Sequence, residues 1–165
     1  MPTHLLDANI FIGSHQRHYG MDFCPGFWEW LVQANLAGRV FSIGRVREEL
    51  LKQEDCLGEW AKIRGPEFFL DYDEMATSRL SEVAAWPASQ PRFKQSAIQT
   101  FLGCADLYII AYARSHNCIV VTHETSAPES KKGVKIPDVC IAFGVKYMTL
   151  WELLRSEGAK FVVSS

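Results

Sequence analysis

Several acidic residues of this chain stand where buried strands are expected to end and helices to begin. Asp7 directly follows two leucines, Asp106 begins a long apolar segment, and Glu124 is separated by two residues from the apolar, β-branched-rich run at 118–121. A carboxylate at the end of a buried strand must be hydrogen-bonded, paired or metal-bound, because a desolvated charge left alone is too costly. These acids are therefore the first candidates for chemistry.

Further acids share this placement. Glu48 and Glu49 lie early in a helix-favouring segment after the expected strand 40–43, and Asp138 follows Pro137 at another helix start. If the strands are parallel, all the acids lie at the carboxyl edge of the sheet, where ligands bind in open α/β sheets. Converging carboxylates repel one another unless a divalent cation holds them, and hard oxygen ligands suit Mg²⁺ or Mn²⁺. The pattern favours a site for such a cation.

Each acid also has a plainer explanation when it is taken alone. Asp7 and Asp106 are suited to helix N-caps or first turns, where aspartate is favoured. A glutamate on a short helix is usually solvated, and Glu124 alone is typical of a loop. The common placement of all the acids at one edge of the sheet is what favours a site.

The elements that must position these acids alternate along the chain. We expect helices at 25–38, 44–65 with a break near Asp55, 73–86, 92–103, 105–117, a short one from Pro137, and 149–158. Strands are expected at 4–7, 40–43, 68–70, 118–121, 146–150 and, as a last edge strand, 161–164, with a long loop at 122–135. Strands that alternate with helices predict an α/β fold with a parallel sheet covered on both faces.

Composition limits the classes of protein. A chain of 165 residues with 48% hydrophobic residues predicts a single globular domain, 1–165. The net charge of -2 excludes a basic field over the whole surface, so nucleic acid would have to bind a local patch.

Cysteine usage and the N-terminus indicate the compartment. The five cysteines are scattered without a C-x-x-C pair, which predicts buried free thiols in a reducing cytosol, not a zinc site or disulfides. The N-terminus lacks a basic segment and a long apolar run, so no signal peptide is expected. No apolar stretch reaches the length of a membrane span, and we expect a cytoplasmic protein without a membrane partner.

Four segments resemble the motifs of PIN-domain nucleases. LLDANIFI resembles the opening motif, with Asp7 as its acid and Asn9 as its polar partner. VREEL is similar to the second motif, an acid before an aliphatic residue, which selects Glu49 over Glu48. ADLYIIAYA matches the third motif, D-x-x-I-x-A-x-A, at Asp106.

The fourth motif departs from the usual T-x-D. VVTHE matches it at Thr122 but has Glu124 in place of aspartate, so Asp138 could share or replace that role. The later segment KIPDVCIAFGVKYMTLWELL resembles a bacterial PIN-like branch long described as a domain of unknown function and associated with toxin–antitoxin pairs.

This resemblance implies a three-layer α/β/α fold around a mostly parallel sheet of about five strands. It implies a metal-dependent endoribonuclease, the toxin of a type II toxin–antitoxin module, with Mg²⁺ or Mn²⁺ as cofactor. The partners would be RNA, a cognate DNA-binding antitoxin and a second copy of the chain in a homodimer.

The resemblance also assigns roles to residues. The catalytic acids would be Asp7, Glu49, Asp106 and Glu124, which would hold the metal together with Asp138. Asn9, Thr122 and Glu48 would orient these ligands or water. Basic residues near the acids are expected to contact RNA phosphates, although any single one could be a solvated surface charge: Arg45, Arg47, Lys131, Lys132 and Lys135.

Two other functions fit the same residues. One is another metal-dependent nuclease or phosphatase, such as a DNA-repair nuclease or a dehalogenase-like phosphatase; the D-A-N segment lacks the second acid of the D-x-D motif that the phosphatase needs. The other is an inactive PIN-like binding module, against which the retained acids argue.

Overall fold

A parallel sheet forms the centre of the computed structural model, which describes residues 3–164. Residues 1, 2 and 165 of the expected domain lie outside the described residues. Within 3–164 the sheet has five strands in the order β3-β2-β1-β4-β5. All paired strands are parallel, as expected. The strands are β1 (His4–Leu6), β2 (Val40–Ile43), β3 (Phe69–Leu70), β4 (Ile119–Val121) and β5 (Tyr147–Met148).

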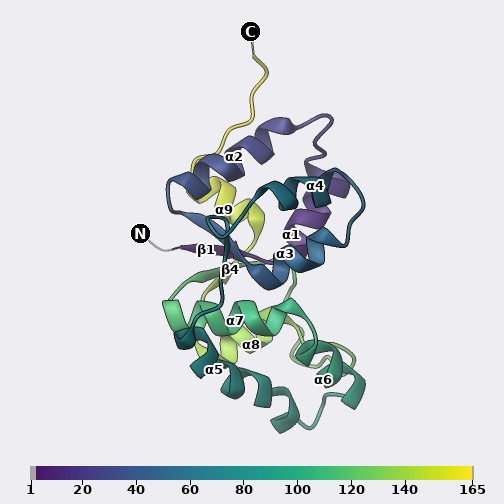
Figure 1. Ribbon diagram of the computed structural model, residues 1–165. Coiled ribbons are helices and arrows are strands. Elements are labelled where there is room, and N and C mark those ends of the chain that lie inside the picture. Colours follow the sequence, from purple (N-terminus) through teal and green to yellow (C-terminus); the bar gives the residue numbers. More distant parts are fainter. Residues whose placement is uncertain (1–2, 165) are drawn as a thin grey trace.

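Helices cover both faces of this sheet. In Figure 1, α1, α2, α3, α4 and α9 lie on one side of the strands, and α5, α6, α7 and α8 lie on the other. This confirms the predicted three-layer α/β/α fold. The helices of the first layer are α1 (Ala8–Gly13), continued by the π-helix η1 (Ser14–His18), α2 (Pro25–Leu36), α3 (Gly44–Leu51), α4 (Cys56–Ile63) and α9 (Leu150–Ser156). Those of the second are α5 (Glu74–Ala85), followed by the 3₁₀ helix η2 (Pro87–Ser89), α6 (Gln95–Leu102), α7 (Ala105–His116) and α8 (Ile136–Phe143).

The order of the strands determines where a ligand can bind. The chain passes from the central β1 to β2 and β3 on one side, and then returns to place β4 and β5 on the other side. Ligands of open α/β sheets bind at the carboxyl ends of the strands where this reversal occurs. The reversal lies at β1, whose carboxyl end leads into Asp7.

Apolar side chains explain the layers. Leu5 and Leu6 of β1 are fully buried, as the central strand of a two-sided sheet requires. Phe27 and Leu31 of α2 are also fully buried, which confirms that the apolar face of this helix belongs to the core. On the opposite face, α7 buries seven of its twelve residues. The core thus holds the strand ends in fixed positions.

Several boundaries differ from the sequence-based expectations. The first strand stops at Leu6, because Asp7 caps α1, a helix that the sequence did not predict. The expected break near Asp55 is present: its carboxylate accepts hydrogen bonds from the N–H groups of Leu57 and Gly58 and caps α4. The helix expected from residue 92 begins at Gln95.

The predicted last strand, 161–164, is wrong. This segment has no regular structure, and the side chains of Val162 and Val163 are exposed. Phe161 packs instead against Tyr19 and Phe27. A β-branched run forms a strand only where a free sheet edge lies beside it, and this segment runs over the helices.

The structure can be compared with the expectations of buried free thiols and of no membrane-spanning segment. All five cysteines carry free thiols, and Cys118 and Cys140 are buried, but Cys56 is exposed, contrary to expectation. Across residues 3–164 no single helix is long and apolar enough to cross a membrane; the bent pair of α6 and α7 meets the criterion by length and composition.

Candidate active site

Asp7 has two different oxygen environments. Its backbone N–H donates to the Val121 carbonyl of β4 at 3.1 Å, and its Oδ1 accepts from the Ile10 N–H at 3.0 Å, which caps α1. Its Oδ2 is buried, and no residue in 3–164 makes a well-aligned hydrogen bond to it, although the Thr122 side chain lies close enough to favour the charged carboxylate. Burial raises the pKa of Asp7 to about 6, although the nearby Thr122 side chain opposes this shift. The capping role is therefore real, but it uses only one of the two carboxylate oxygens.

Asp106 lies in the first turn of α7 and is strongly perturbed by its surroundings. Burial raises its pKa to about 7, and the negative charges of Asp7, Glu124 and Glu49 add to the shift, in that order. Each of these carboxylates must therefore lie within electrostatic reach of Asp106. The fold brings together the four acids that the sequence singled out as catalytic.

Glu49, not Glu48, is the acid of α3 that faces α7. The Oε1 atom of Glu49 accepts a hydrogen bond from the Ala105 N–H at 3.2 Å, beside Asp106. The side chain of Glu48 is exposed. The choice of Glu49 over Glu48 as a catalytic acid comes from the resemblance and stays a prediction; the structure shows that Glu49 is the one that contacts α7.

The segment after β4 positions Glu124. Thr122 is buried, and its Oγ1 accepts from the Glu124 N–H at 3.1 Å, which turns the chain. Oε1 of Glu124 accepts from the Ile136 N–H at the start of α8, at 3.1 Å. The charge of Glu124 also raises the pKa of Asp7. Glu124 thus connects α8 to the group of acids.

Asp138 has a different environment. Its Oδ1 accepts from the Ser126 hydroxyl at 2.6 Å and its Oδ2 accepts from the Ala127 N–H at 3.0 Å. Its charge is not among the causes that raise the pKa of Asp7 or Asp106. Both oxygens of Asp138 thus hold the loop 122–135 against α8.

The acids fit a divalent cation by their chemistry. Within residues 3–164 no three His, Cys, Asp or Glu side chains are already arranged as a metal-binding group. Yet Oδ2 of Asp7 is buried without a well-aligned hydrogen-bond partner in 3–164, and carboxylates of like charge lie near Asp106. A cation would supply the missing partner and offset the repulsion, after small side-chain rotations.

The two arginines of α3 behave differently. Arg47 donates to the carbonyls at the end of α4: Nε to Ala61 and Arg64, and Nη2 to Lys62. Arg45 is exposed, and its guanidinium carbon lies 3.9 Å from the centroid of the Tyr108 ring. Arg47 therefore stabilises the helix pair, and Arg45 remains available to a ligand.

The remaining candidates are the loop lysines and Asn9. Lys131 and Lys132 are exposed and Lys135 is half-buried. Near Lys131 their loop is held by the Lys94 N–H, which donates to the Lys131 carbonyl at 2.9 Å, and by Nε of Arg92, which donates to the Ser130 carbonyl at 3.2 Å. The side chain of Asn9 is exposed, and only its backbone N–H contributes to the pKa of Asp7.

Sequence reasoning missed an aromatic group on the other side of the acids. The His123 ring centroid lies 4.7 Å from that of Trp151, and the exposed His18 lies 5.0 Å from Trp151. Burial lowers the pKa of His123, and His18 adds to the shift. The only signal in the sequence was that His123 stands beside Glu124.

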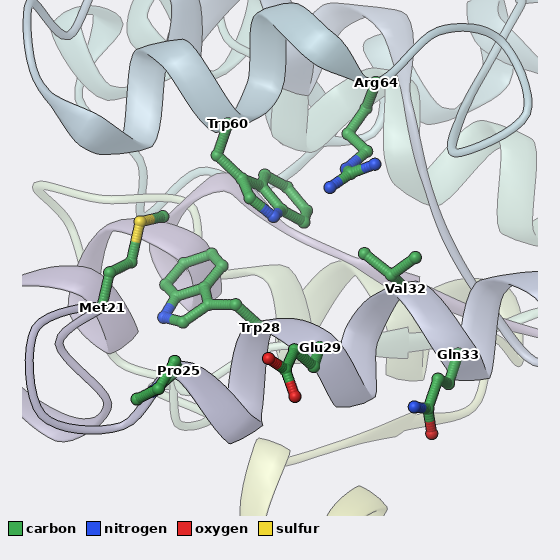
Figure 2. Close-up of a pocket in the computed structure, with 8 residues that line it drawn as sticks. All are labelled: Met21, Pro25, Trp28, Glu29, Val32, Gln33, Trp60 and Arg64. Carbon is green, nitrogen blue, oxygen red and sulfur yellow. The ribbon is translucent and has the colours of Figure 1, made fainter.

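An apolar pocket lies elsewhere on the molecule. Figure 2 shows the indole rings of Trp28 and Trp60 lying close together between α2 and α4, with Met21 beside them. The pocket has a volume of about 500 Å³, and the two rings meet edge to face with their centroids 5.2 Å apart. Glu29 lines this pocket, but none of the candidate catalytic acids does, so the pocket is separate from the candidate active site.

The parallel sheet and the two helical layers form a PIN-like fold, and the candidate acids lie at the carboxyl edge of its sheet. The chain belongs to the family described as "Domain of unknown function (DUF4411)", whose model matches residues 4–161.

A solved structure shares this fold: VapBC2 from Rickettsia felis bound to a DNA fragment from their promoter, with 15% identity, a TM-score of 0.56, and coverage of 89% of this chain and 98% of that chain. The chain also has a weaker similarity to FitAcB from Neisseria gonorrhoeae, with 19% identity, a TM-score of 0.48, and coverage of 90% of this chain and 99% of that chain. No curated protein matches the chain.

Proposed function

We propose that this protein is a metal-dependent endoribonuclease and the toxin of a type II toxin–antitoxin module. The observation that carries the proposal is the buried Asp7 carboxylate, whose Oδ2 has no well-aligned hydrogen-bond partner in 3–164, beside carboxylates that raise the pKa of Asp106. Such a concentration of negative charge destabilises a folded chain unless it serves a ligand, and perturbed carboxylates are typical of active sites.

Asp7, Asp106, Glu49 and Glu124 would hold one or two Mg²⁺ or Mn²⁺ ions. A divalent cation supplies a more acidic water and offsets charge on a phosphate during in-line attack. Thr122 holds the Glu124 backbone, and the Ile10 N–H keeps Asp7 oriented by donating to its Oδ1. Asn9 and Glu48, both exposed, would contact solvent or substrate at the rim.

The partners follow from the resemblance and the fold. RNA would bind across the acids, and a DNA-binding antitoxin would neutralise the toxin. The similarity to VapBC2, a complex bound to promoter DNA, supports an antitoxin partner of this kind. We extend the proposal to a homodimer in the cytoplasm.

The test compares the purified wild-type protein with Asp7→Asn. Asparagine keeps an oxygen to accept the Ile10 N–H, so α1 stays capped while the charge is lost. The wild type should cleave single-stranded RNA with Mg²⁺ or Mn²⁺ but not with EDTA, and the variant should be inactive. Cleavage of DNA alone would instead identify a DNA nuclease, and equal activity of both proteins would contradict the proposal.

Expression in cells tests the toxin assignment separately. The wild type should arrest growth, and Asp7→Asn should not. Co-expression of the small DNA-binding protein encoded beside it should restore growth. A nuclease that never arrests growth would retain the catalytic proposal and exclude the toxin.

A further inference from the structure

One exposed cation–aromatic pair lies next to the acids on the β2 side of the sheet. Arg45 stands four residues before Glu49 in α3, so both side chains lie on the same face of that helix, about 6 Å apart along its axis. This face packs on the start of α7, because Glu49 binds the Ala105 N–H and Arg45 covers the Tyr108 ring. Arg45 therefore lies within about one helical turn of the acids.

The Arg45 guanidinium is held by Tyr108 alone. Arg45 has no ion pair or hydrogen bond to any residue in 3–164, whereas Arg47 has three carbonyl partners. Tyr108 is fixed in turn by Tyr72, whose ring lies edge-on at 5.5 Å and whose hydroxyl donates to the Tyr108 carbonyl at 3.2 Å. Arg45 thus presents a flat guanidinium with one face backed by an aromatic ring and its polar edge free.

The second group lies on the β5 side. His18, His123 and Trp151 come from η1, the segment after β4 and α9. Their ring centroids lie 4.7 to 6.1 Å apart. His18 is exposed and Trp151 is half-buried, so part of this aromatic group faces solvent. Nε2 of His123 is buried and has no hydrogen-bond partner within residues 3–164.

The order of the strands places the two groups on opposite sides of the acids. Arg45 follows β2, Asp7 follows β1, and Trp151 follows β5, in a sheet whose order is β2-β1-β4-β5 on this side. His123 follows β4, between the acids and Trp151. A chain of nucleotides laid across this edge would therefore meet Arg45–Tyr108, the acids and the His18–Trp151 group in succession.

We infer that these two groups are stacking platforms for the nucleotides on either side of the cleaved bond, Arg45 on Tyr108 for one and His18 with Trp151 for the other. The inference rests on the proposed nuclease function and adds the residues that select the substrate. Aromatic rings and guanidinium planes stack on the open face of an unpaired base. The bases of a duplex are already stacked on one another and offer no such face. The platforms thus select single-stranded RNA over duplex.

The experiment measures binding and cleavage separately. A fluorescent single-stranded RNA of about 12 nucleotides, within the usual length of such sites, is titrated with protein in EDTA, beside the same strand annealed to its complement. The variants are Arg45→Lys, which keeps the charge and removes the plane, and His18→Ala, which removes an exposed ring. Lys146→Ala is the matched control, because this exposed lysine precedes β5 at the opposite edge of the sheet.

We expect each platform variant to raise the Kd for single-stranded RNA about fivefold to tenfold, as the loss of one stacked base does, and to leave duplex binding unchanged. In cleavage with Mg²⁺ the same variants should raise KM with little change in kcat. Lys146→Ala should match the wild type.

Variants that bind and cleave like Lys146→Ala would overturn the inference while wild-type cleavage upheld the nuclease. Conversely, a wild type that binds the strand through both platforms but cleaves nothing would uphold the inference on binding and reject the proposed function. Arg45→Lys binding as tightly as the wild type, with Arg45→Ala weaker, would show a phosphate contact and overturn stacking at this position.

Discussion

The charge of Asp7 is the largest electrostatic cause, after burial, of the raised pKa of Asp106. Asp7 directly follows β1 and Asp106 lies in the first turn of α7, so the fold brings together two acids that are far apart in the chain. Two buried like charges cannot both be ionised without cost. This relationship predicts how the protein responds to pH and to divalent cations.

Without metal, the protein should become less stable as the pH rises from about 4 to about 7. The unfolded aspartates lose their protons near 3.8, but folded Asp7 and Asp106 keep theirs up to about 6 and about 7. The folded state therefore binds more protons in this range, and the free energy of unfolding falls with pH. Melting curves in EDTA at about pH 5 and about pH 8 measure the effect.

A divalent cation should reverse this trend. Because Mg²⁺ or Mn²⁺ needs the charged carboxylates, it should raise the melting temperature more at about pH 8 than at about pH 5. The double variant Asp7→Asn, Asp106→Asn is the control and should show neither the pH slope of the wild type nor the metal effect. A metal effect in this control would place the cation elsewhere.

Asp106→Asn should fold normally and lose RNA cleavage. The substitution keeps the size of the side chain and removes the charge that a cation needs, and it also removes a charge that burial destabilises. In EDTA at about pH 8 its melting temperature should equal or exceed that of the wild type. Near-wild-type cleavage by this variant would exclude Asp106 from the active site.

Substitutions of Glu124 and of Asp138 should have different effects on the metal requirement of cleavage and on stability. Glu124→Gln should raise the Mg²⁺ or Mn²⁺ concentration for half-maximal cleavage about tenfold or more, in the range of lost ligand support. Asp138→Asn should change this concentration less and should lower stability by about 1 kcal/mol, because an amide cannot accept from both Ser126 and Ala127. Metal titrations and melting curves of both variants decide which of the two acids supports the metal. A larger change in the metal requirement for Asp138→Asn than for Glu124→Gln would reverse the assignment.

The loop lysines should act through their charge. Replacing Lys131, Lys132 and Lys135 together with alanine should weaken RNA binding and flatten its dependence on salt, because each phosphate contact releases counterions. Arg47→Lys is a useful contrast: it should lower the melting temperature by weakening the bonds to the end of α4, without changing the salt slope. An unchanged salt slope in the triple variant would show that the loop faces away from RNA.

The sequence by itself determined the class of fold and the edge at which the acids gather. Buried strands appear in the sequence as short apolar runs and helices as longer amphipathic or apolar segments. Their alternation along the chain predicts a parallel sheet. In such a sheet Asp7, Glu49 and Glu124 must follow strands on one side, whatever the details of packing. The break of the helix near Asp55 was also readable from the sequence, because its cause is local: in the structure the Asp55 carboxylate caps α4.

Only the tertiary structure decided which polar groups meet. Asp138 and Glu124 look alike in the sequence, yet one binds Ser126 and the other lies near Asp7. Arg45 and Arg47 are two residues apart, yet Arg45 covers the Tyr108 ring and Arg47 donates to a carbonyl at the end of α4. Side chains two positions apart on a helix point in different directions, and what each meets depends on elements distant in the chain. The segment 161–164 is irregular because its conformation also depends on distant elements. A strand needs a neighbouring sheet edge, which its own residues do not provide.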